Sequence, residues 1–176
     1  MLDRSPDRLS PFTVPRLMPN AASGAISIRY NLQGPASTHA TACASSGHAI
    51  ADAMQYIRRG LADVMVTGGA EAGVTPLCIG AFMTMKALST RNAEPTKASR
   101  PFDKDRDGFV LSEGAACLVI ESEAHAKARG ATIYAEVVGY GLTGDAFHIT
   151  SPDESGDGGE RAMRTALQRS GLDASE

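Results

Sequence analysis

The sequence is poor in cysteine, with only Cys43, Cys78 and Cys117 among 176 residues. An odd number of widely spaced cysteines argues against a disulfide framework and favours a reducing compartment. No Cys-X-X-Cys pair or His/Cys cluster has the spacing of metal ligands, so the sequence gives no support for a structural zinc site. We therefore expect no metal in the protein.

The sequence also lacks an excess of basic charge and any long apolar run. Its net charge is −3, which disfavours a nucleic-acid-binding protein. The apolar run Ala115–Ile120 is far too short to span a bilayer, and residues 1–15 have no apolar core of the kind a secretory signal needs. With 43% hydrophobic and 21% charged residues, the composition predicts a globular cytoplasmic protein without a membrane segment.

Apolar runs and turn residues alternate along the chain in a way that predicts both strands and helices. We expect irregular chain at residues 1–20, a long surface loop at 89–108 and a flexible connection at 151–160. The predicted strands are residues 36–43, 63–69, 109–120 and 133–140, and the predicted helices are residues 44–59, 76–88, 122–129 and 160–170. Such alternation is typical of a layered α/β fold.

Cys43 lies where a predicted strand of small residues leads directly into a predicted helix. The free N–H groups and the positive dipole end of a helix N-terminus stabilise a thiolate, and a backbone N–H there can donate to an oxyanion. This placement suggests a nucleophile, but a small buried core residue would look the same, so the local sequence leaves both interpretations open. We expect structural roles for His39, His48, Cys78 and Cys117.

Many short segments, in order, resemble the β-ketoacyl-acyl carrier protein synthases of type II fatty acid synthesis, particularly the synthase II class. The similar segments are Ser10-Pro11-Phe12, Gly34-Pro35, Thr41-Ala42-Cys43, Asp63-Val64-Met65-Val66, Gly68-Gly69-Ala70-Glu71, Ala87-Leu88-Ser89-Thr90-Arg91-Asn92, Ser99-Arg100-Pro101-Phe102-Asp103, Arg106-Asp107-Gly108-Phe109-Val110, Arg129-Gly130-Ala131 and residues 144–152.

The resemblance implies a thiolase-like, layered α-β-α fold, of which this chain is an incomplete part. Residues 1–176 would form a partial ketosynthase domain, with most of the N-terminal half at about 1–130 and the start of the C-terminal half at about 131–176. Cys43 would accept an acyl group as a thioester and then undergo decarboxylative Claisen condensation with a malonyl group. Both groups would arrive on the phosphopantetheine of acyl carrier protein, with no further cofactor, and the full-length family is homodimeric.

The resemblance also carries over to five other positions. Phe82 would line the acyl pocket, and Asp145 and His148 would belong to a loop that gates the site. Lys86 and Arg91 would contact the acidic carrier protein, and residues 86–106 hold six Lys or Arg against three Asp or Glu. The same residues could equally be a core phenylalanine, a solvent-facing loop and a solvated charged segment.

Two histidine motifs that the family uses for condensation, a Gly-Thr motif and a Gly-His-Leu-Gly motif, do not occur in this sequence. We therefore expect this chain alone to be inactive in condensation. Three alternatives stay open: a ketosynthase module of a polyketide synthase, a non-catalytic ketosynthase-like subunit, and a cysteine hydrolase of another fold that would use His125 or His148 as its base.

Overall fold

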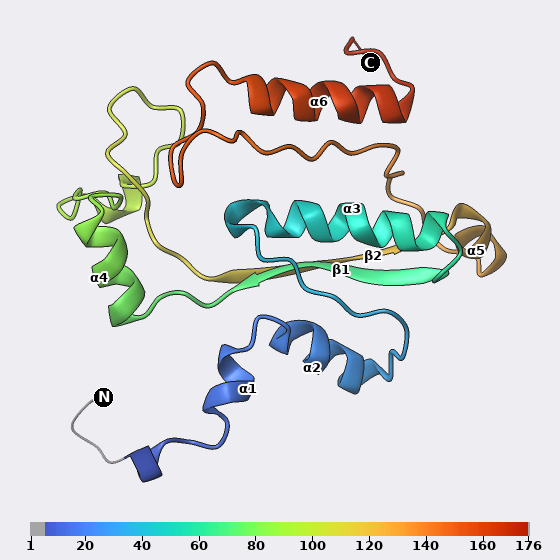
Figure 1. The fold of residues 1–176 in the computed structure, drawn as a ribbon, viewed down its shortest axis with the longest axis horizontal. Helices are drawn as coiled ribbons and strands as arrows, with labels where there is room; N and C mark the ends of the chain where they lie inside the picture. The colour runs from blue at the N-terminus through green and yellow to red at the C-terminus, as the bar shows by residue number, and fades with distance from the viewer. Residues whose placement is uncertain (1–5, 176) are drawn as a thin grey trace. The chain divides into compact units, whose positions relative to one another are not determined.

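The structure is a computed structural model that describes residues 6–175 and has eight main elements (Figure 1). Two strands and six helices are joined by three short 3-10 turns. In chain order they are η1 (Pro6–Arg8), α1 (Thr13–Leu17), α2 (Ala21–Tyr30), η2 (Ala42–Ala44), α3 (Ser45–Arg58), β1 (Val64–Glu71), α4 (Pro76–Thr84), η3 (Pro95–Lys97), β2 (Gly114–Glu121), α5 (Glu123–Ala128) and α6 (Asp157–Ser170).

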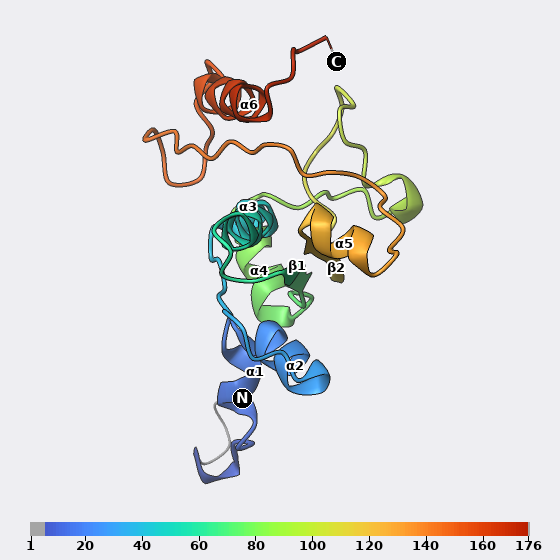
Figure 2. The ribbon, with the colours of Figure 1, turned by 90° about the vertical axis from the view of Figure 1, so that its right-hand side faces the viewer.

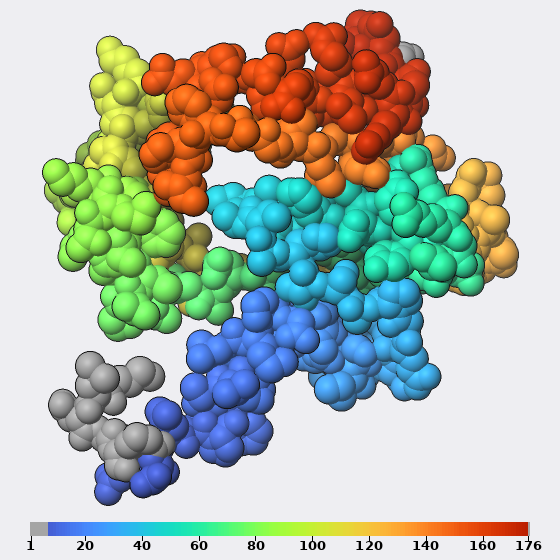
Figure 3. Space-filling model, viewed as in Figure 1, coloured from blue at the N-terminus to red at the C-terminus, as the bar shows by residue number. Residues whose placement is uncertain are grey.

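The chain divides into two compact units. The first unit comprises the described parts of residues 1–67 and 118–176, and the second comprises residues 68–117. Within the first unit, α1 and α2 pack against each other, and their atoms form the blue body of Figure 3. The turn that contains Cys43 and the loop that contains Asp145 and His148 also belong to the first unit.

Capping residues mark the start of α4, the start of α5 and the end of α6 near the predicted positions. Thr75 precedes α4, and its Oγ1 accepts a hydrogen bond from N of Cys78 at 3.2 Å. Ser122 Oγ likewise accepts from N of His125 at 3.3 Å at the start of α5. Gly171 ends α6 in the left-handed conformation, with φ of 73°. The helices expected at 44–59, 76–88 and 122–129 are confirmed within a few residues at each end.

The strands β1 and β2 form a two-stranded sheet. Ser122 N donates to Asp63 O at 3.1 Å at one end, and Gly68 lies against Ala116 further along. Partner numbers fall as β1 numbers rise, so the strands are antiparallel. A Cβ at Gly68 would collide with the Ala116 carbonyl oxygen, so the close approach of the strands requires glycine here.

Two predicted strands, at residues 36–43 and 133–140, are wrong. Both segments are irregular, and most of their residues are exposed. An extended segment becomes a strand only when a neighbouring strand pairs with its N–H and C=O groups. Among the described residues, the only strand ladder is that between β1 and β2, and neither of these two segments is hydrogen-bonded to it as a third strand.

Three further predictions need correction. Residues 1–20, expected to be irregular, contain α1, and α2 follows at a place where no helix was predicted. The predicted strand 109–120 begins only at Gly114, with Phe109 making a single bridge to Leu88. Helix α6 begins at Asp157, inside the expected connection 151–160, because the acidic residues there lie in a first helical turn.

Helix α6 packs closely on the extended segment 133–143, and Figures 1 and 2 show the two side by side. The Arg169 guanidinium lies over the Tyr140 ring, 4.4 Å from its centroid. Arg58 of α3 donates to the carbonyl oxygen of Val138 at 3.1 Å. This segment is therefore held by α6 and α3 rather than by strand pairing.

Little apolar surface is buried among the described residues. The buried apolar side chains there are Ala51, Ala53, Met54, Ala98 and Ala126. In contrast, Leu77 of α4 is 82% exposed and Met83 is 62% exposed, although α4 is apolar on all sides. A helix of that composition is normally covered. None of the described helices has the length and apolar character needed to cross a bilayer.

Candidate functional site at the start of helix α3

Cys43 lies in the middle of a tight turn that leads without a break into α3. The turn is the 3-10 helix η2, and α3 begins at Ser45, two residues after the cysteine. Ala42, directly before Cys43, has φ of 50°, a left-handed conformation that costs an L-residue with a Cβ about 1–2 kcal/mol. The chain therefore adopts a strained conformation at the residue that precedes the thiol.

Ser45 closes this turn with two hydrogen bonds. Its Oγ accepts from N of Thr41 at 2.9 Å and donates to the carbonyl oxygen of Ala42 at 2.8 Å. The backbone adds a third bond, from N of Ala44 to O of Thr41 at 3.1 Å. One serine hydroxyl thus joins the Thr41 N–H, which lies before the strained φ of Ala42, to the Ala42 carbonyl, which lies after it.

His48, one turn further into α3, reaches back to the same segment. Its Nδ1 lies 2.9 Å from Oγ1 of Thr41 and 3.0 Å from the carbonyl oxygen of Ala44. A protonated Nδ1 donates to Ala44, whereas an unprotonated Nδ1 accepts from the Thr41 hydroxyl, so either tautomer holds the turn. The structural role predicted for His48 is consistent with these contacts, but the sequence did not indicate that it would touch this turn.

His39 lies behind His48. The two rings are stacked with centroids 6.1 Å apart and an interplanar angle of 22°. Nε2 of His39 is 3.0 Å from Oδ2 of Asp52, which lies one helical turn beyond His48 on α3. The chain that enters the turn is therefore hydrogen-bonded to α3 at Thr41 and lies in contact with it at His39.

The Cys43 side chain is exposed, so the interpretation of Cys43 as a buried core residue is wrong. It lies beside the first turn of the 14-residue helix α3. The N–H groups of a first helical turn have no hydrogen-bond partners within the helix. Such a terminus stabilises negative charge, either on a thiolate or on the oxygen of an attacked carbonyl. The geometry is suited to a nucleophile that attacks an acyl carbonyl.

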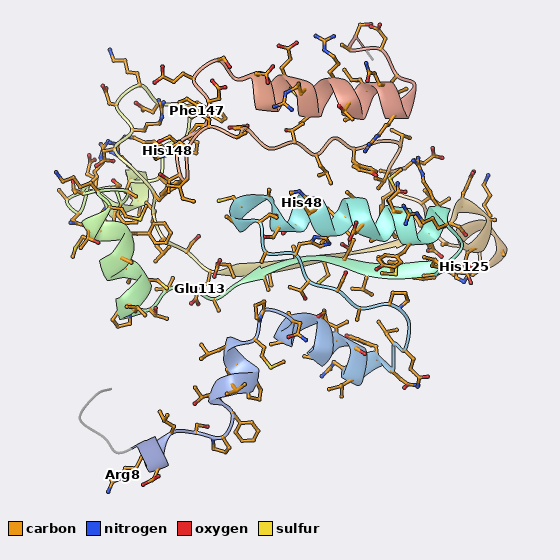
Figure 4. The ribbon with its side chains drawn as sticks, in the orientation of Figure 1. Arg8, His48, Glu113, His125, Phe147 and His148 are labelled. Carbon is orange, nitrogen blue, oxygen red and sulfur yellow. The ribbon has the colours of Figure 1, made fainter. Side chains whose placement is uncertain are left out.

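Asp145 and His148, predicted to belong to a gating loop, lie together in the irregular segment before α6. Both line one open hollow with Thr143, Ala146, Phe147 and Ile149, and Figure 4 labels Phe147 and His148 in this segment. Nδ1 of His148 accepts from N of Thr150 at 3.2 Å and from N of Ser151 at 3.1 Å. Cys43 is not among the residues that line this hollow.

Asp145 is anchored at the start of α6. Its Oδ2 accepts from N of Asp153 at 3.2 Å, and its Oδ1 occupies the place that a Cβ at Gly158 would need. Thr143 adds a bond from its Oγ1 to the carbonyl oxygen of Gly158 at 2.7 Å. The chain before His148 therefore contacts the first turn of α6 at Thr143 and Asp145.

The other predicted site residues belong to the second unit. Phe82 lies on α4 and is 36% exposed. Lys86 follows α4 with φ of 57° and is exposed. Arg91 is half-buried and paired with Glu94 at 2.5 Å, and hydrogen bonding to Glu94 raises the pKa of Arg91. The roles of Phe82, Lys86 and Arg91 stay predictions.

The remaining cysteines differ in their surroundings. Cys78 on α4 is half-buried, whereas Cys117 on β2 is exposed. Within residues 6–175, no three His, Cys, Asp or Glu side chains come together as metal ligands would.

The comparisons with known families cover most of the chain. Residues 1–126 match the family described as "Beta-ketoacyl synthase, N-terminal domain", and residues 134–176 match "Beta-ketoacyl synthase, C-terminal domain". The boundary between the N-terminal and C-terminal halves of the domain, which we expected at about residue 130, stays a prediction.

The chain is also similar over nearly all of its length to curated relatives. It is 53% identical over 175 residues to a 3-oxoacyl-(acyl-carrier-protein) synthase 2 of Rhizobium meliloti and 52% identical over 172 residues to that of Vibrio cholerae. These alignments cover 99% and 98% of this chain and 42% of each relative. A mitochondrial 3-oxoacyl-(acyl-carrier-protein) synthase of Arabidopsis thaliana is 52% identical, with 94% of this chain and 36% of the relative covered.

Solved structures agree with the expected fold. A β-ketoacyl synthase from Burkholderia phymatum matches with a TM-score of 0.90 and 41% identity, covering 99% of this chain and 42% of that one. A ketosynthase of a type II polyketide synthase, solved with its acyl-carrier protein, matches with a TM-score of 0.90 and 36% identity, covering 97% and 42%. The expectation of a partial thiolase-like fold is confirmed, and the chain belongs to the β-ketoacyl synthase family.

Proposed function

We propose that Cys43 accepts the acyl group in a β-ketoacyl-acyl carrier protein synthase of fatty acid elongation. The observation that carries this proposal is the place of Cys43, exposed in the turn at the start of α3, within the segment that matches the family. The Cys43 thiolate attacks the carbonyl carbon of an acyl thioester. The C–S bond to the donor thiol then breaks, and the donor leaves as a thiol after taking up a proton.

The developing oxyanion is stabilised by backbone N–H groups at the turn. The product of this step is an acyl-cysteine thioester. In the second half of the reaction, a malonyl thioester loses carbon dioxide, and the resulting enolate carbon attacks the acyl-cysteine carbonyl. The C–S bond to Cys43 breaks, which regenerates the thiolate and releases a lengthened β-ketoacyl thioester.

For this chain, the proposal is acyl acceptance and not complete condensation. None of its four histidines matches the two histidine motifs that the resemblance implies. Both substrates carry their own activated thioester, so the proposal names no further cofactor. A homodimer and a cytoplasmic location stay predictions.

Acyl transfer can be tested directly by mass spectrometry. The chain is incubated with a fatty acyl thioester of acyl carrier protein, digested, and analysed at each cysteine. We expect an acyl adduct at Cys43, none in Cys43→Ala, and an unchanged yield in Cys117→Ala. An absent adduct at Cys43, or equal acylation of Cys43, Cys78 and Cys117, would contradict the proposal.

We further propose that Lys86 and Arg91 contact the acidic acyl carrier protein. Lys86 is exposed directly after α4, while Arg91 already has Glu94 as a partner, so Lys86 should contribute more. We expect Lys86→Glu to weaken binding of the carrier protein, and added salt to reduce the difference from the parent chain. Arg16→Glu on α1 is the control for net charge, and an equal loss with this variant would argue against a specific surface.

A polyketide ketosynthase is the second candidate, because a ketosynthase of that kind is among the similar structures. Identity of 50–53% with several synthase 2 relatives, against 36% with that ketosynthase, favours fatty acid elongation. Acylation of Cys43 by polyketide intermediates but not by saturated fatty acyl thioesters would reverse this preference.

A further inference from the structure

Ala42, directly before Cys43, has a strained left-handed φ, which must be held by contacts beyond the backbone hydrogen bonds of α3. The left-handed conformation of Ala42 brings its Cβ close to the following carbonyl oxygen, which an alanine avoids in a free chain. Strained backbone persists only where the surrounding contacts fix it. Besides the backbone bond from N of Ala44 to O of Thr41, the side chains that contact this turn are those of Ser45 and His48 on α3.

We propose that Ser45 and His48 are positioning residues that clamp the turn around Cys43 and hold Ala42 in its left-handed conformation. This inference rests on the proposed role of Cys43 and adds the residues that present it. Neither side chain needs to touch the acyl group. Their effect is to fix where the thiol lies relative to the N–H groups of the first helical turn.

The two side chains hold the turn from both directions. Ser45 bonds the Thr41 N–H and the Ala42 carbonyl, which are the backbone groups on either side of the strained φ. His48 bonds the Thr41 hydroxyl or the Ala44 carbonyl, depending on its tautomer, and so reaches one end of the turn or the other. Figure 4 labels His48 at this end of α3. Loss of either residue leaves Ala42 free to relax to an ordinary φ.

His39 supports this clamp from behind. Its ring stacks on that of His48, and its Nε2 lies 3.0 Å from Oδ2 of Asp52, so His48 on α3 has a second imidazole and not solvent beside it. The groups that face the His48 ring are therefore a hydroxyl, a carbonyl and a second imidazole. We assign His39 a supporting role and the clamp itself to Ser45 and His48.

The rate of alkylation of Cys43 in the full chain measures this positioning without requiring turnover. Iodoacetamide is added at neutral pH, and the rate is followed separately at each cysteine by mass spectrometry. We expect Ser45→Ala and His48→Leu each to slow alkylation of Cys43 by roughly two- to fivefold, the factor expected when an anion loses a helix terminus. Cys78 and Cys117 serve as internal controls and should not change.

Two compensating variants separate positioning from general stability. His48→Asn keeps a polar group near the place of Nδ1 and should retain most of the Cys43 rate that His48→Leu loses. Ala42→Gly, added to Ser45→Ala, should restore the rate, because glycine adopts the left-handed conformation without a Cβ clash. A loss of packing elsewhere in the chain would not be repaired by a glycine at position 42.

The proposal is overturned if Cys43 reacts at the parent rate in both single variants. It is also overturned if all three cysteines change together, or if Ala42→Gly brings no recovery. These outcomes are separable from those for the proposed function. If the variants slow alkylation of Cys43 as expected but the parent chain forms no acyl adduct, the acyl-transfer role is refuted and the clamp stands. If the parent chain forms the adduct but the variants alkylate at the parent rate, the clamp alone is refuted.

Discussion

A methyl group placed on Gly139 would lie 2.5 Å from the carbonyl oxygen of Ala166 in α6. It would also lie 2.9 Å from N of Ser170, so backbone atoms surround the position. The chain before the Asp145–His148 loop thus reaches α6 only because position 139 has no side chain. This contact fixes one end of the loop that we predict to gate the site.

We therefore expect Gly139→Ala to lower the free energy of unfolding by about 1–3 kcal/mol, the usual cost of overpacking. Chemical denaturation followed by circular dichroism would measure it. Gly144→Ala is the matched control, since a Cβ there meets no atom within 4 Å. Equal effects of the two substitutions would show that α6 does not pack on residue 139 in solution.

The cap of α4 provides a second prediction. Thr75 Oγ1 accepts from N of Cys78 at 3.2 Å and supplies a partner for one otherwise free N–H group. Thr75→Ala should destabilise the chain by about 1 kcal/mol in a denaturation experiment, whereas Thr75→Ser, which keeps the hydroxyl and is at least as good an N-cap, should leave the stability nearly unchanged. If the serine variant loses as much as the alanine variant, the hydroxyl is not the cap.

Glu121 should make stability depend on pH in the acid range. Hydrogen bonds from Arg129 and then His125 lower the pKa of Glu121 from 4.5 to about 2. Its Oε1 accepts from Arg129 at 2.5 Å and its Oε2 lies 2.6 Å from Nδ1 of His125. A pKa lower in the folded than in the unfolded chain means that this stabilisation is complete above pH 4.5 and is lost as the pH falls to about 2.

Denaturation of the parent chain and of Glu121→Gln between pH 2 and pH 7 would test this. The two stabilities should differ above pH 4.5 and converge as the pH approaches 2. Glu160→Gln is the control, because Glu160 pairs with Arg164 on the exposed face of α6. A constant difference between the parent and Glu121→Gln across the whole range would mean that Glu121 is not held as an anion by its partners.

The exposed apolar face of α4 should bind hydrophobic dyes. Leu77 is 82% exposed on a helix with no charged residue, so we expect the chain to enhance the fluorescence of an anilinonaphthalene sulfonate dye. Leu77→Lys should reduce this signal and raise solubility. Gln168→Lys on α6 adds the same charge without removing an apolar group, and a similar reduction with that variant would point to charge alone.

The sequence predicted four of the six described helices because their signals are local, and it missed α1 and α2. Thr75, Ser122 and Gly171 mark helix ends through bonds or conformations that involve only residues within a few positions. The strands expected at 63–69 and 109–120 were also largely right, since apolar runs bounded by glycines favour strands wherever a partner is available. The motif string, read in order, was sufficient to indicate the family.

Wrong strand predictions at 36–43 and 133–140 show the limit of such local signals. Their composition favours an extended chain, and tertiary contacts decide whether a neighbour pairs with it. Segment 133–143 is held instead by α6 and by the side chain of Arg58. The structure likewise decided against a buried Cys43, since burial depends on what packs over a residue and not on its type.

At the candidate site, the sequence by itself determined that a cysteine stands at the start of a helix. Only the tertiary structure showed that Ala42 is left-handed, because alanine gives no sign of it in the sequence. It also showed that the side chains of His48 and Ser45 contact the turn. These contacts depend on the direction in which α3 continues from Cys43. Residue type fixes which groups can bond, and the path of the backbone determines which of them meet.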